Sequence, residues 1–338
     1  MRLSDNNLVP LQLQIFDLFF NYKLKLFYKM KKMVLCFVVA VTSLTLQAQF
    51  KVKSLQQVHT GAMEKAYHPR FMPDGNLLVS AENYTGLGIV NVKSGVYTEL
   101  TDMCSAGYYP VIANDGKTII VRQKNDDYTV DIYSINVADK SISTVATQLP
   151  HLNQLGLCNN KVSYAVNSKV MTAEVTNSST SQKFNPKDNI FVTEEDLKIV
   201  VYNNGRRIVL DPLKGQIDWG ETQYVWTSLS PNKDKILFSC ADNAYICDIN
   251  GKNLVKVGPL RAPVWRGNTH VVGMHDKDDG YFYTESNIVI AKADGTQYQQ
   301  LTPATSEIKM FPAVSNDGNK IAFHTLEGKI YLMTIEEE

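Results

Sequence analysis

The chain has 338 residues, and its 34 Lys or Arg balance its 34 Asp or Glu to a formal net charge of zero. This balance excludes the strongly basic character of nucleic-acid-binding proteins and of polybasic membrane-surface proteins. Charged residues make up 20% and hydrophobic residues 44%, which is typical of a packed globular chain and unlike a disordered one. Five cysteines are too few for a small disulfide-dense protein.

The N-terminal segment contains the pattern of an export signal. Residues 30–48 have two lysines directly after Met30, continue with a mainly apolar region of 14 residues and end on a small residue. This is typical of a secretory signal peptide, and it is too short to cross a bilayer as a helix. Residues 1–29 precede it as an upstream extension, which indicates a start assigned before the true initiator at Met30; a long signal or an amphipathic anchor is the alternative. We expect residues 49–338 to form the exported mature domain.

Loss of the leader would change the charge of the protein. Residues 1–48 hold six Lys or Arg and two Asp or Glu, so the remaining chain has 28 basic and 32 acidic residues, a net charge near −4. We expect this mature chain to be a monomer with no transmembrane segment, located in the periplasm or secreted.

Three segments of the mature chain align as internal repeats: 68–79, 109–120 and 311–322. In each, a proline precedes an Asp-Gly pair by five residues, and an apolar run follows. Asp-Gly between apolar runs predicts a β-hairpin, because glycine tolerates positive φ and aspartate caps its own turn. These repeats therefore indicate an all-β chain.

Each repeat continues with a second β-rich run, a turn and a run ending near Leu-Thr, which makes four short strands. Four-stranded units of about 40–45 residues predict a β-propeller. The last unit is one strand short, whereas residues 50–55 form a lone strand, so we expect the two to pair and close the ring. Seven blades follow, or six if one degenerate unit is an insertion. The units begin near residues 67, 108, 150, 188, 224, 262 and 309.

The Pro-x-x-Ser-Pro-Asp-Gly pattern, its apolar continuation and the terminal Leu-Thr resemble TolB-type β-propeller repeats. The resemblance covers nearly the whole mature chain but only the propeller of TolB, without the α/β domain that precedes it in that family. It implies a periplasmic or surface scaffold that binds protein or carbohydrate partners. Similar propellers also occur in oligogalacturonate lyases, which implies, as an alternative, a carbohydrate-active enzyme with a metal in the channel.

The residue before the motif proline ends the approach to the innermost strand, which lines the channel of a propeller. Aromatic, histidine and amide side chains at one rim would offer apolar faces and hydrogen-bonding groups to a peptide or a sugar. Packing between blades is the alternative explanation. Alignment of the units gives the channel-rim candidates His68, Tyr109, Asn153, Asn189, Trp226, Ala262 and Phe311. A loop over 82–88 adds Asn83 and Tyr84 as a second candidate.

No catalytic motif stands out. A Gly-x-Ser-x-Gly nucleophile motif and a dinucleotide fingerprint are both absent from the sequence. The acidic run 276–279 before Gly280 lacks the spacing of a calcium loop and indicates a solvated hairpin. We expect no cofactor, no resident metal and no catalytic residue.

Four cysteines remain in the mature chain, an even number in an oxidising compartment. Cys240 and Cys247 would face each other across a hairpin if its turn centred on Asn243-Ala244. A disulfide between them and two free buried thiols are both open at this point.

Together these observations predict a secreted or periplasmic propeller that binds a protein or peptide of the cell envelope at the channel face. Carbohydrate is the alternative ligand, and a structural spacer without a partner is a third reading. Nucleic acid is not expected as a partner.

Overall fold

We describe the chain from a computed structural model, which covers residues 50–150, 152, 154–158, 161–174, 190–216 and 223–338. All of these lie in the unit that runs from Gln49 to Glu338. The predicted leader at 30–48 and the extension at 1–29 lie outside the described residues, so both remain predictions.

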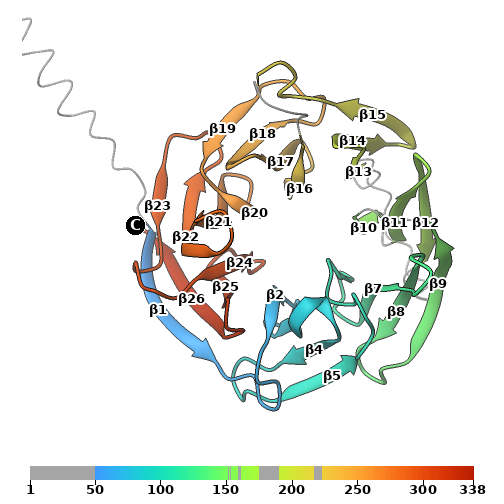
Figure 1. The fold of residues 1–338 in the computed structure, drawn as a ribbon, viewed down its shortest axis with the longest axis horizontal. Coiled ribbons are helices and arrows are strands. Elements are labelled where there is room, and N and C mark those ends of the chain that lie inside the picture. The colour runs from blue at the N-terminus through green and yellow to red at the C-terminus, as the bar shows by residue number, and fades with distance from the viewer. Residues whose placement is uncertain (1–49, 151, 153, 159–160, 175–189, 217–222) are drawn as a thin grey trace, which may run out of the picture. The chain divides into compact units, whose positions relative to one another are not determined.

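Seven antiparallel sheets stand around a central axis as the blades of a propeller (Figure 1). The prediction of an all-β propeller is confirmed, and the count is seven blades and not six. Among the described residues, five sheets have four strands and two have three. One short 3₁₀ turn, η1 (Glu82–Tyr84), is the helical element in this part of the chain.

The first four blades follow one another along the chain, each starting at its innermost strand. Blade one holds β2 (Tyr67–Phe71), β3 (Leu77–Ser80), β4 (Leu87–Val90) and β5 (Tyr97–Thr101). Blade two holds β6 (Val111–Ile112), β7 (Thr118–Lys124), β8 (Val130–Asn136) and β9 (Ile142–Leu149). Blades three and four hold β10 (Gly156–Cys158), β11 (Lys161–Val166), β12 (Lys169–Glu174), β13 (Ile190–Glu195), β14 (Lys198–Asn203) and β15 (Arg206–Leu210).

The C-terminal half supplies the other three blades. Blade five holds β16 (Val225–Leu229), β17 (Lys235–Cys240), β18 (Asn243–Asp248) and β19 (Val255–Gly258). Blade six holds β20 (Arg261–Arg266), β21 (His270–Asp278), β22 (Tyr283–Lys292) and β23 (Tyr298–Gln300). Blade seven holds β24 (Lys309–Val314), β25 (Lys320–Thr325), β26 (Ile330–Glu337) and, as its outermost strand, β1 (Phe50–Val58).

The two ends of the described chain meet in blade seven, as the sequence predicts. β1 pairs antiparallel with β26 from Phe50 opposite Glu337 to Val58 opposite Ile330. The side-chain amide of Gln299 in β23 adds a second link, because its Oε1 accepts from the Phe50 N–H (2.8 Å) and its Nε2 donates to the Phe50 carbonyl (2.7 Å). Blade six is therefore bonded directly to the strand that closes the ring.

The Asp-Gly pairs form the predicted turns between the first and second strands of blades one, two and seven. In blade one, Gly75 has φ +85°, its N–H donates to the Met72 carbonyl (2.9 Å), and Asp74 Oδ1 accepts from the Asn76 N–H (2.9 Å). The Asp115-Gly116 and Asp317-Gly318 turns repeat these bonds. One sequence motif therefore fixes one turn geometry three times.

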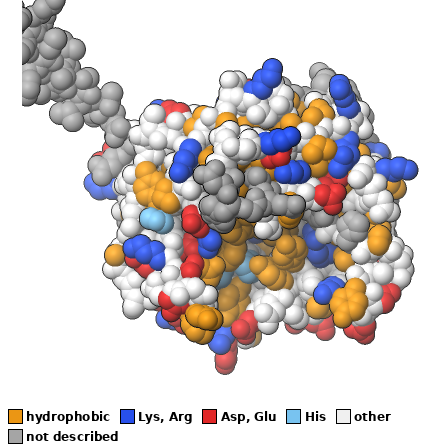
Figure 2. All heavy atoms as spheres, turned by 45° about the horizontal axis from the view of Figure 1, so that its top comes forward, with side chains coloured by type: hydrophobic (Ala, Val, Ile, Leu, Met, Phe, Trp, Pro, Cys, Tyr) orange, Lys and Arg blue, Asp and Glu red, His pale blue; other side chains and the backbone are white. Residues whose placement is uncertain are grey.

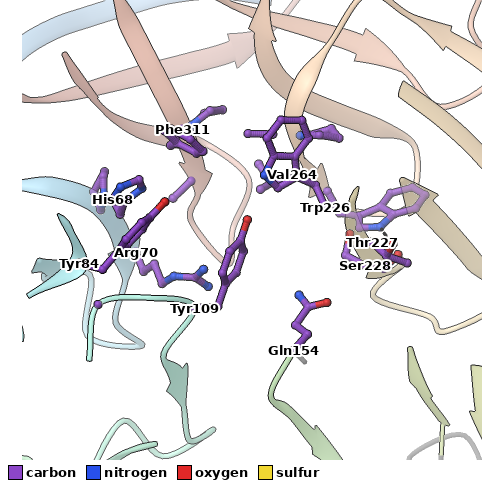
Figure 3. A pocket seen from close by; sticks show the side chains of 17 residues that line it. His68, Arg70, Tyr84, Tyr109, Gln154, Trp226, Thr227, Ser228, Val264 and Phe311 are labelled. Carbon is purple, nitrogen blue, oxygen red and sulfur yellow. Dashed lines mark hydrogen bonds between the residues drawn. The ribbon is translucent and has the colours of Figure 1, made fainter. Parts of the chain in front are cut away.

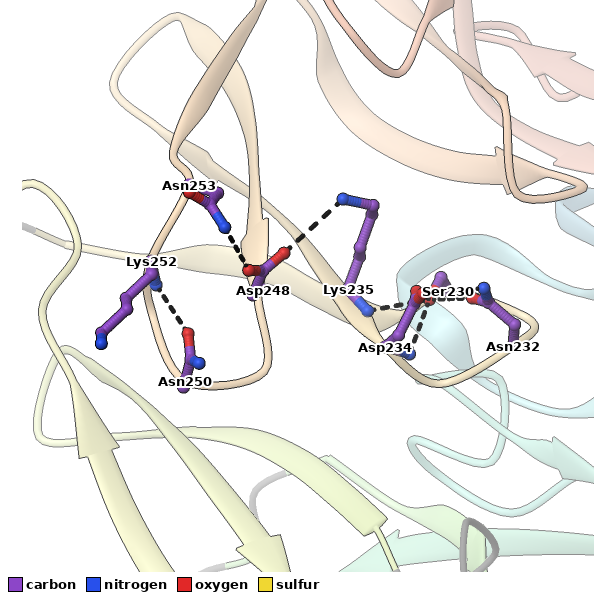
Figure 4. A network of polar contacts seen from close by, with 8 residues as sticks. All are labelled: Ser230, Asn232, Asp234, Lys235, Asp248, Asn250, Lys252 and Asn253. Atoms are coloured by element: carbon purple, nitrogen blue, oxygen red, sulfur yellow. Dashed lines mark hydrogen bonds and ion pairs between the residues drawn. The ribbon is translucent and has the colours of Figure 1, made fainter.

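Blade five makes the same turn without glycine. Lys233 takes the glycine position with φ +59°, and its N–H donates to the Ser230 carbonyl (2.8 Å). Ser230 Oγ accepts from the backbone N–H groups of Asp234 (3.2 Å) and Lys235 (3.0 Å), as Figure 4 shows. The polar network of Ser230 holds the turn in a conformation that a lysine disfavours.

The core lies between neighbouring blades, so the second strand of a blade is buried on both faces. In β17, Ile236 and Phe238 pack against blade four, whereas Leu237 packs against blade six. This alternation is the two-residue period of a strand, and it explains why β17 has a continuous apolar run. Full burial of a side chain such as Phe238 contributes about 1.5–3 kcal/mol.

Of the two possibilities left open for Cys240 and Cys247, the structure has the free buried thiols and not the disulfide. The hairpin turns at Ala241-Asp242, which places Cys240 opposite Asn243 and Cys247 opposite Ile236. This offset of four residues separates the two cysteines by about 13 Å along the strands, and a disulfide needs Cα atoms within about 7 Å. Both thiols are free and buried.

Candidate functional site

The channel-rim residues share an unusual backbone conformation. His68, Tyr109, Trp226, Ala262 and Phe311 have φ values of +51°, +49°, +55°, +45° and +49°. In four of these blades the residue lies at a shift in register between the first and second strands, which is a β-bulge. The left-handed φ therefore recurs at the same position in five blades, and a β-bulge accompanies it in four of them.

This conformation is costly for residues other than glycine. A left-handed backbone costs on the order of 1–3 kcal/mol per residue and persists only where the surrounding structure enforces it. Four of the five residues also precede a proline, where an extended backbone is normal. The left-handed backbone redirects the side chain of each of these residues, and the result is a set of side chains around one cavity (Figure 3).

The cavity has a volume of about 250 Å³. The described residues that line it belong to, or directly precede, the inner strands of every blade except blade four, and Tyr84 adds a contribution from the loop between β3 and β4. In the space-filling view, hydrophobic side chains gather in a hollow in the middle of the visible face (Figure 2). The cavity is thus central to the ring and mainly apolar.

Aromatic rings form one wall of the cavity. His68 stacks on Tyr84 with ring centroids 4.3 Å apart and meets Phe311 edge-on at 4.7 Å. Tyr84 in turn meets Tyr108 at 5.0 Å, and Tyr108 meets Tyr109 at 4.9 Å. These contacts join five rings into one continuous row, so this wall is rigid.

A second histidine lies behind this wall. His324 of β25 is 3% exposed, stacks on Phe311 and lies 4.8 Å from His68 between ring centroids. Burial lowers the pKa of His68 to about 3, and the neighbouring His324 and Arg70 contribute to this shift. Burial lowers the pKa of His324 to about 4, against the opposing effect of its hydrogen bond to the Thr325 carbonyl. Both rings are therefore neutral at pH 7.

Among the described residues that line the cavity, one is a cation. The Arg70 guanidinium in β2 lies over the Tyr109 ring, 5.2 Å from its centroid, and points into the space in Figure 3. Burial lowers the pKa of Arg70 without removing its charge at pH 7, since the unperturbed pKa of arginine exceeds 12. Burial also raises the pKa of Tyr109, and the nearby Arg70 opposes that shift. The site therefore combines an apolar wall with one positive group.

Blade four contributes a carboxyl group beside the cavity. Glu194 at the end of β13 accepts a hydrogen bond from the backbone N–H of Thr227 (2.7 Å), a residue of the cavity wall. Burial raises the pKa of Glu194, and the hydrogen bond to Thr227 opposes the shift. This carboxyl group links blades four and five next to the site.

The structure brings most of the predicted residues together. His68, Tyr109, Trp226, Ala262 and Phe311 line the one cavity, and so does Tyr84 from the loop candidate. Asn83 does not, because it is exposed in η1 with φ +57°. Asn153 and Asn189 lie outside the described residues.

Sequence reasoning missed Arg70 and Gln154. Arg70 occupies the second position after the bulge residue, and the matching positions in other blades hold Val111, Ser228, Val264 and Ala313. The alignment therefore contained the signal, because Arg70 is the one charged residue in that set. Gln154 carried no such signal, since its unit lacks the proline motif.

The described residues contain no group of three His, Cys, Asp or Glu side chains placed to hold a metal ion. The alternative function, a carbohydrate-active enzyme with a metal in the channel, would need such a group of ligands. That alternative stays a prediction. Over the same residues, no helix has the length and apolar character needed to cross a membrane.

Comparison with known proteins supports the fold. No protein-family model and no curated protein sequence matches the chain. Among solved structures, TolB from Acinetobacter baumannii is similar at 14% identity over 74% of this chain, with a TM-score of 0.49. The match spans only 57% of that TolB chain.

Two further solved structures match more of their own length. A catalytically inactive virginiamycin B lyase from Staphylococcus aureus with quinupristin has 14% identity, covering 85% of this chain and 99% of its own, with a TM-score of 0.55. A chain of the mitotic checkpoint complex has 12% identity, covering 83% and 94%, with a TM-score of 0.56. Likenesses at these identities show the fold alone, and the propeller predicted from TolB-type repeats is confirmed.

Proposed function

We propose that this protein is an exported seven-bladed propeller that binds a peptide segment of a protein partner in the channel cavity. The observation that carries the proposal is the recurrence of a left-handed φ at five rim positions, all lining one cavity. A strained backbone persists only where the surrounding structure enforces it. A binding site shared by these five residues at the centre of the ring would explain why all five adopt the strained conformation.

The lining of the cavity suits a peptide. Aromatic faces at Tyr84, Tyr109 and Trp226 accept apolar side chains, whereas Gln154 and Ser228 bring hydrogen-bonding groups to the same space. A volume of about 250 Å³ holds one or two side chains rather than a folded domain. A propeller of similar fold is described with the ligand quinupristin, which supports ligand binding by this architecture.

Export rests on the pattern of residues 30–48 and on the mildly acidic mature chain. The location in the periplasm or outside the cell and the cell-envelope origin of the partner therefore belong to the proposal. Mass determination of the N-terminus after secretion tests it, since export predicts cleavage after Ala48.

The binding role is tested with a peptide library displayed on phage, selected on the purified protein. Tyr109→Ala and Trp226→Ala should weaken binding of the selected peptides at least about tenfold, because each removes an aromatic wall. Tyr281→Ala is the matched control, since Tyr281 is 91% exposed and does not line the cavity. Equal affinities for the wild-type protein and both cavity variants, at unchanged melting temperature, would overturn the proposal.

A further inference from the structure

The positive charge lies on one side of the cavity. Arg70 projects from β2, and the other cavity residues at its position, Ser228, Val264 and Ala313, are neutral. The Tyr109 ring covers one face of the guanidinium at 5.2 Å. A guanidinium stacked in this way keeps the N–H groups of its edge available, and that edge matches the two oxygens of a carboxylate.

No carboxylate in the described part of the chain forms an ion pair with Arg70. Glu194, the carboxyl group beside the cavity, accepts from the Thr227 N–H, and burial raises its pKa towards the neutral acid. Glu194 is therefore engaged elsewhere and poorly suited to neutralise the cavity.

A second guanidinium lies close by. Arg122 of β7 is 6% exposed, stacks over Tyr108 at 5.0 Å and donates from Nη1 to the Leu152 carbonyl (3.1 Å). The positive charge of Arg70 contributes to lowering the pKa of Arg122 to about 10, after the larger effect of burial. The positive charges of Arg70 and Arg122 repel each other in a poorly hydrated site. An anion bound in the cavity next to Arg70 would reduce that repulsion.

We infer that Arg70 is the subsite for a carboxylate of the peptide that the cavity binds, which it holds through the free edge of its guanidinium. The inference rests on the proposed function and names the ligand chemistry. The carboxylate comes from the C-terminus of the peptide or from an Asp or Glu side chain. The aromatic wall of His68, Tyr84 and Phe311 then receives an apolar side chain next to that carboxylate.

The test uses N-acetylated hexapeptide libraries made in four versions: free or amidated at the C-terminus, each with or without Asp and Glu. The libraries are selected on the purified protein, and the affinities of recovered peptides and of their carboxamide analogues are measured by calorimetry. The carboxylate form should bind about 10- to 100-fold more tightly than its carboxamide analogue. Enrichment from the free-terminus library identifies the C-terminus as the source, and enrichment from the amidated acidic library identifies a side chain.

Arg70→Met keeps an apolar stem without the charge and should reduce the ratio of carboxylate to carboxamide affinity to near one. Arg70→Gln provides a second neutral variant, in case the methionine disturbs folding. Arg206→Met is the matched control, because Arg206 is an exposed arginine on blade four and should leave the ratio unchanged.

The outcomes separate the two proposals. If no library version binds, the proposed function fails and takes this inference with it. If peptides bind and Trp226→Ala weakens them, but carboxamides bind as well as carboxylates, the inference about Arg70 is wrong and the proposed function stands. A ratio that persists in both Arg70 variants also overturns the inference.

Discussion

His324 makes the stability of the fold depend on the protonation state of one side chain. Its Nδ1 lies 2.9 Å from the Thr325 carbonyl, and because a carbonyl only accepts, the ring proton is on Nδ1. Its Nε2 is buried and has no hydrogen-bond partner among the described residues. A proton added to Nε2 would place a charge among the rings of Tyr67, His68 and Phe311, with Arg70 close to His68. The fold therefore requires this histidine to be neutral.

This requirement gives stability a defined pH dependence. The pKa of His324 falls from 6.5 in the unfolded chain to about 4 in the folded protein. Below pH 6.5 His324 is protonated in the unfolded chain but stays neutral in the folded protein. The free energy of unfolding therefore decreases as the pH falls towards 4. The slope from one histidine reaches about 1.4 kcal/mol per pH unit.

We expect His324→Gln to reduce the slope of unfolding free energy against pH between 6.5 and 4 by up to about 1.4 kcal/mol per pH unit, whatever its effect at pH 7. His68, with a pKa of about 3, keeps its own contribution to the slope. Urea denaturation at a series of pH values measures this slope. His59→Gln is the control, because His59 is exposed. A slope unchanged by His324→Gln would show that other titrating groups, and not this histidine, control the acid transition.

At the same scale, the sequence predicted which residues meet but not how their backbone places them. Alignment on the motif proline put Phe311 and Trp226 at the rim, although Trp226 precedes a threonine. It gave no sign of a left-handed φ, since a residue before proline is normally extended. That conformation results from the packing of the whole ring, which no local propensity encodes.

The hairpin between the first two strands is the element whose sequence dependence is clearest. Blades one and seven use Gly75 and Gly318 at φ +85° and +73°, and blade five uses Lys233 at φ +59°. In all three turns the N–H at the left-handed position donates to the carbonyl three residues earlier, so these turns can be compared by the residue that adopts the left-handed conformation. The penalty for a residue with a Cβ there is about 1 kcal/mol.

Lys233→Gly should therefore raise the free energy of unfolding by about 0.5–1 kcal/mol, because glycine adopts this φ without strain. Gly75→Ala should lower it by a similar amount. A Cβ at Gly75 meets nothing within 4 Å, so this variant reports backbone strain without a steric clash. Chemical denaturation measures both changes, and a lower stability for Lys233→Gly would contradict the account.

Elements with strong turn signals were predictable, and those with two competing signals were not. The run Cys240-Ala-Asp-Asn-Ala allows a turn at Ala241-Asp242 or at Asn243-Ala244. The structure uses the first, with Ala241 at φ +50°, and this shift of two residues moves Cys247 opposite Ile236. Register depends on which side chains the sheet must bury, and Cys247 is 0% exposed.

For the whole molecule, stability depends on the closure of the ring. Gln299 joins blade six to β1 by bonding both the N–H and the carbonyl of Phe50 (2.8 and 2.7 Å). Arg266 strengthens the same junction, since it lies 4.5 Å from the Phe50 ring centroid and pairs with Glu337 (3.1 Å). Blades six and seven are thus held together at the point where the chain closes on itself.

Gln299→Ala should lower the free energy of unfolding by about 1–3 kcal/mol, because it leaves two backbone groups of Phe50 without partners. Gln297→Ala is the matched control two residues away, since the side chain of Gln297 has no hydrogen bond to another described residue. Thermal and chemical unfolding give the comparison. Equal stabilities for the two variants would show that the junction does not depend on this amide.

The seven-bladed ring was predictable because it repeats. Each copy of the proline and Asp-Gly motif confirms the others, and the strand missing from the last unit identified 50–55 as its partner. The degenerate third and fourth units keep the strand rhythm without the motif, which explains why six blades remained an alternative. Arg70 was not predictable from periodicity, because a functional charge departs from the repeat.

The order in which the strands of blade seven are made has a consequence for folding. During synthesis β1 emerges before the seven blades of this ring, and its partner β26 follows the other strands of the ring, so β1 stays unpaired at both edges until then. A free strand of this kind can pair with a second copy of the chain and exchange between molecules. Lys51 and Lys53 are suited to prevent this, because adjacent copies would bring like charges together. In the finished ring they face Glu338 and Glu336 instead, so the same two lysines discourage the wrong pairing and favour the right one.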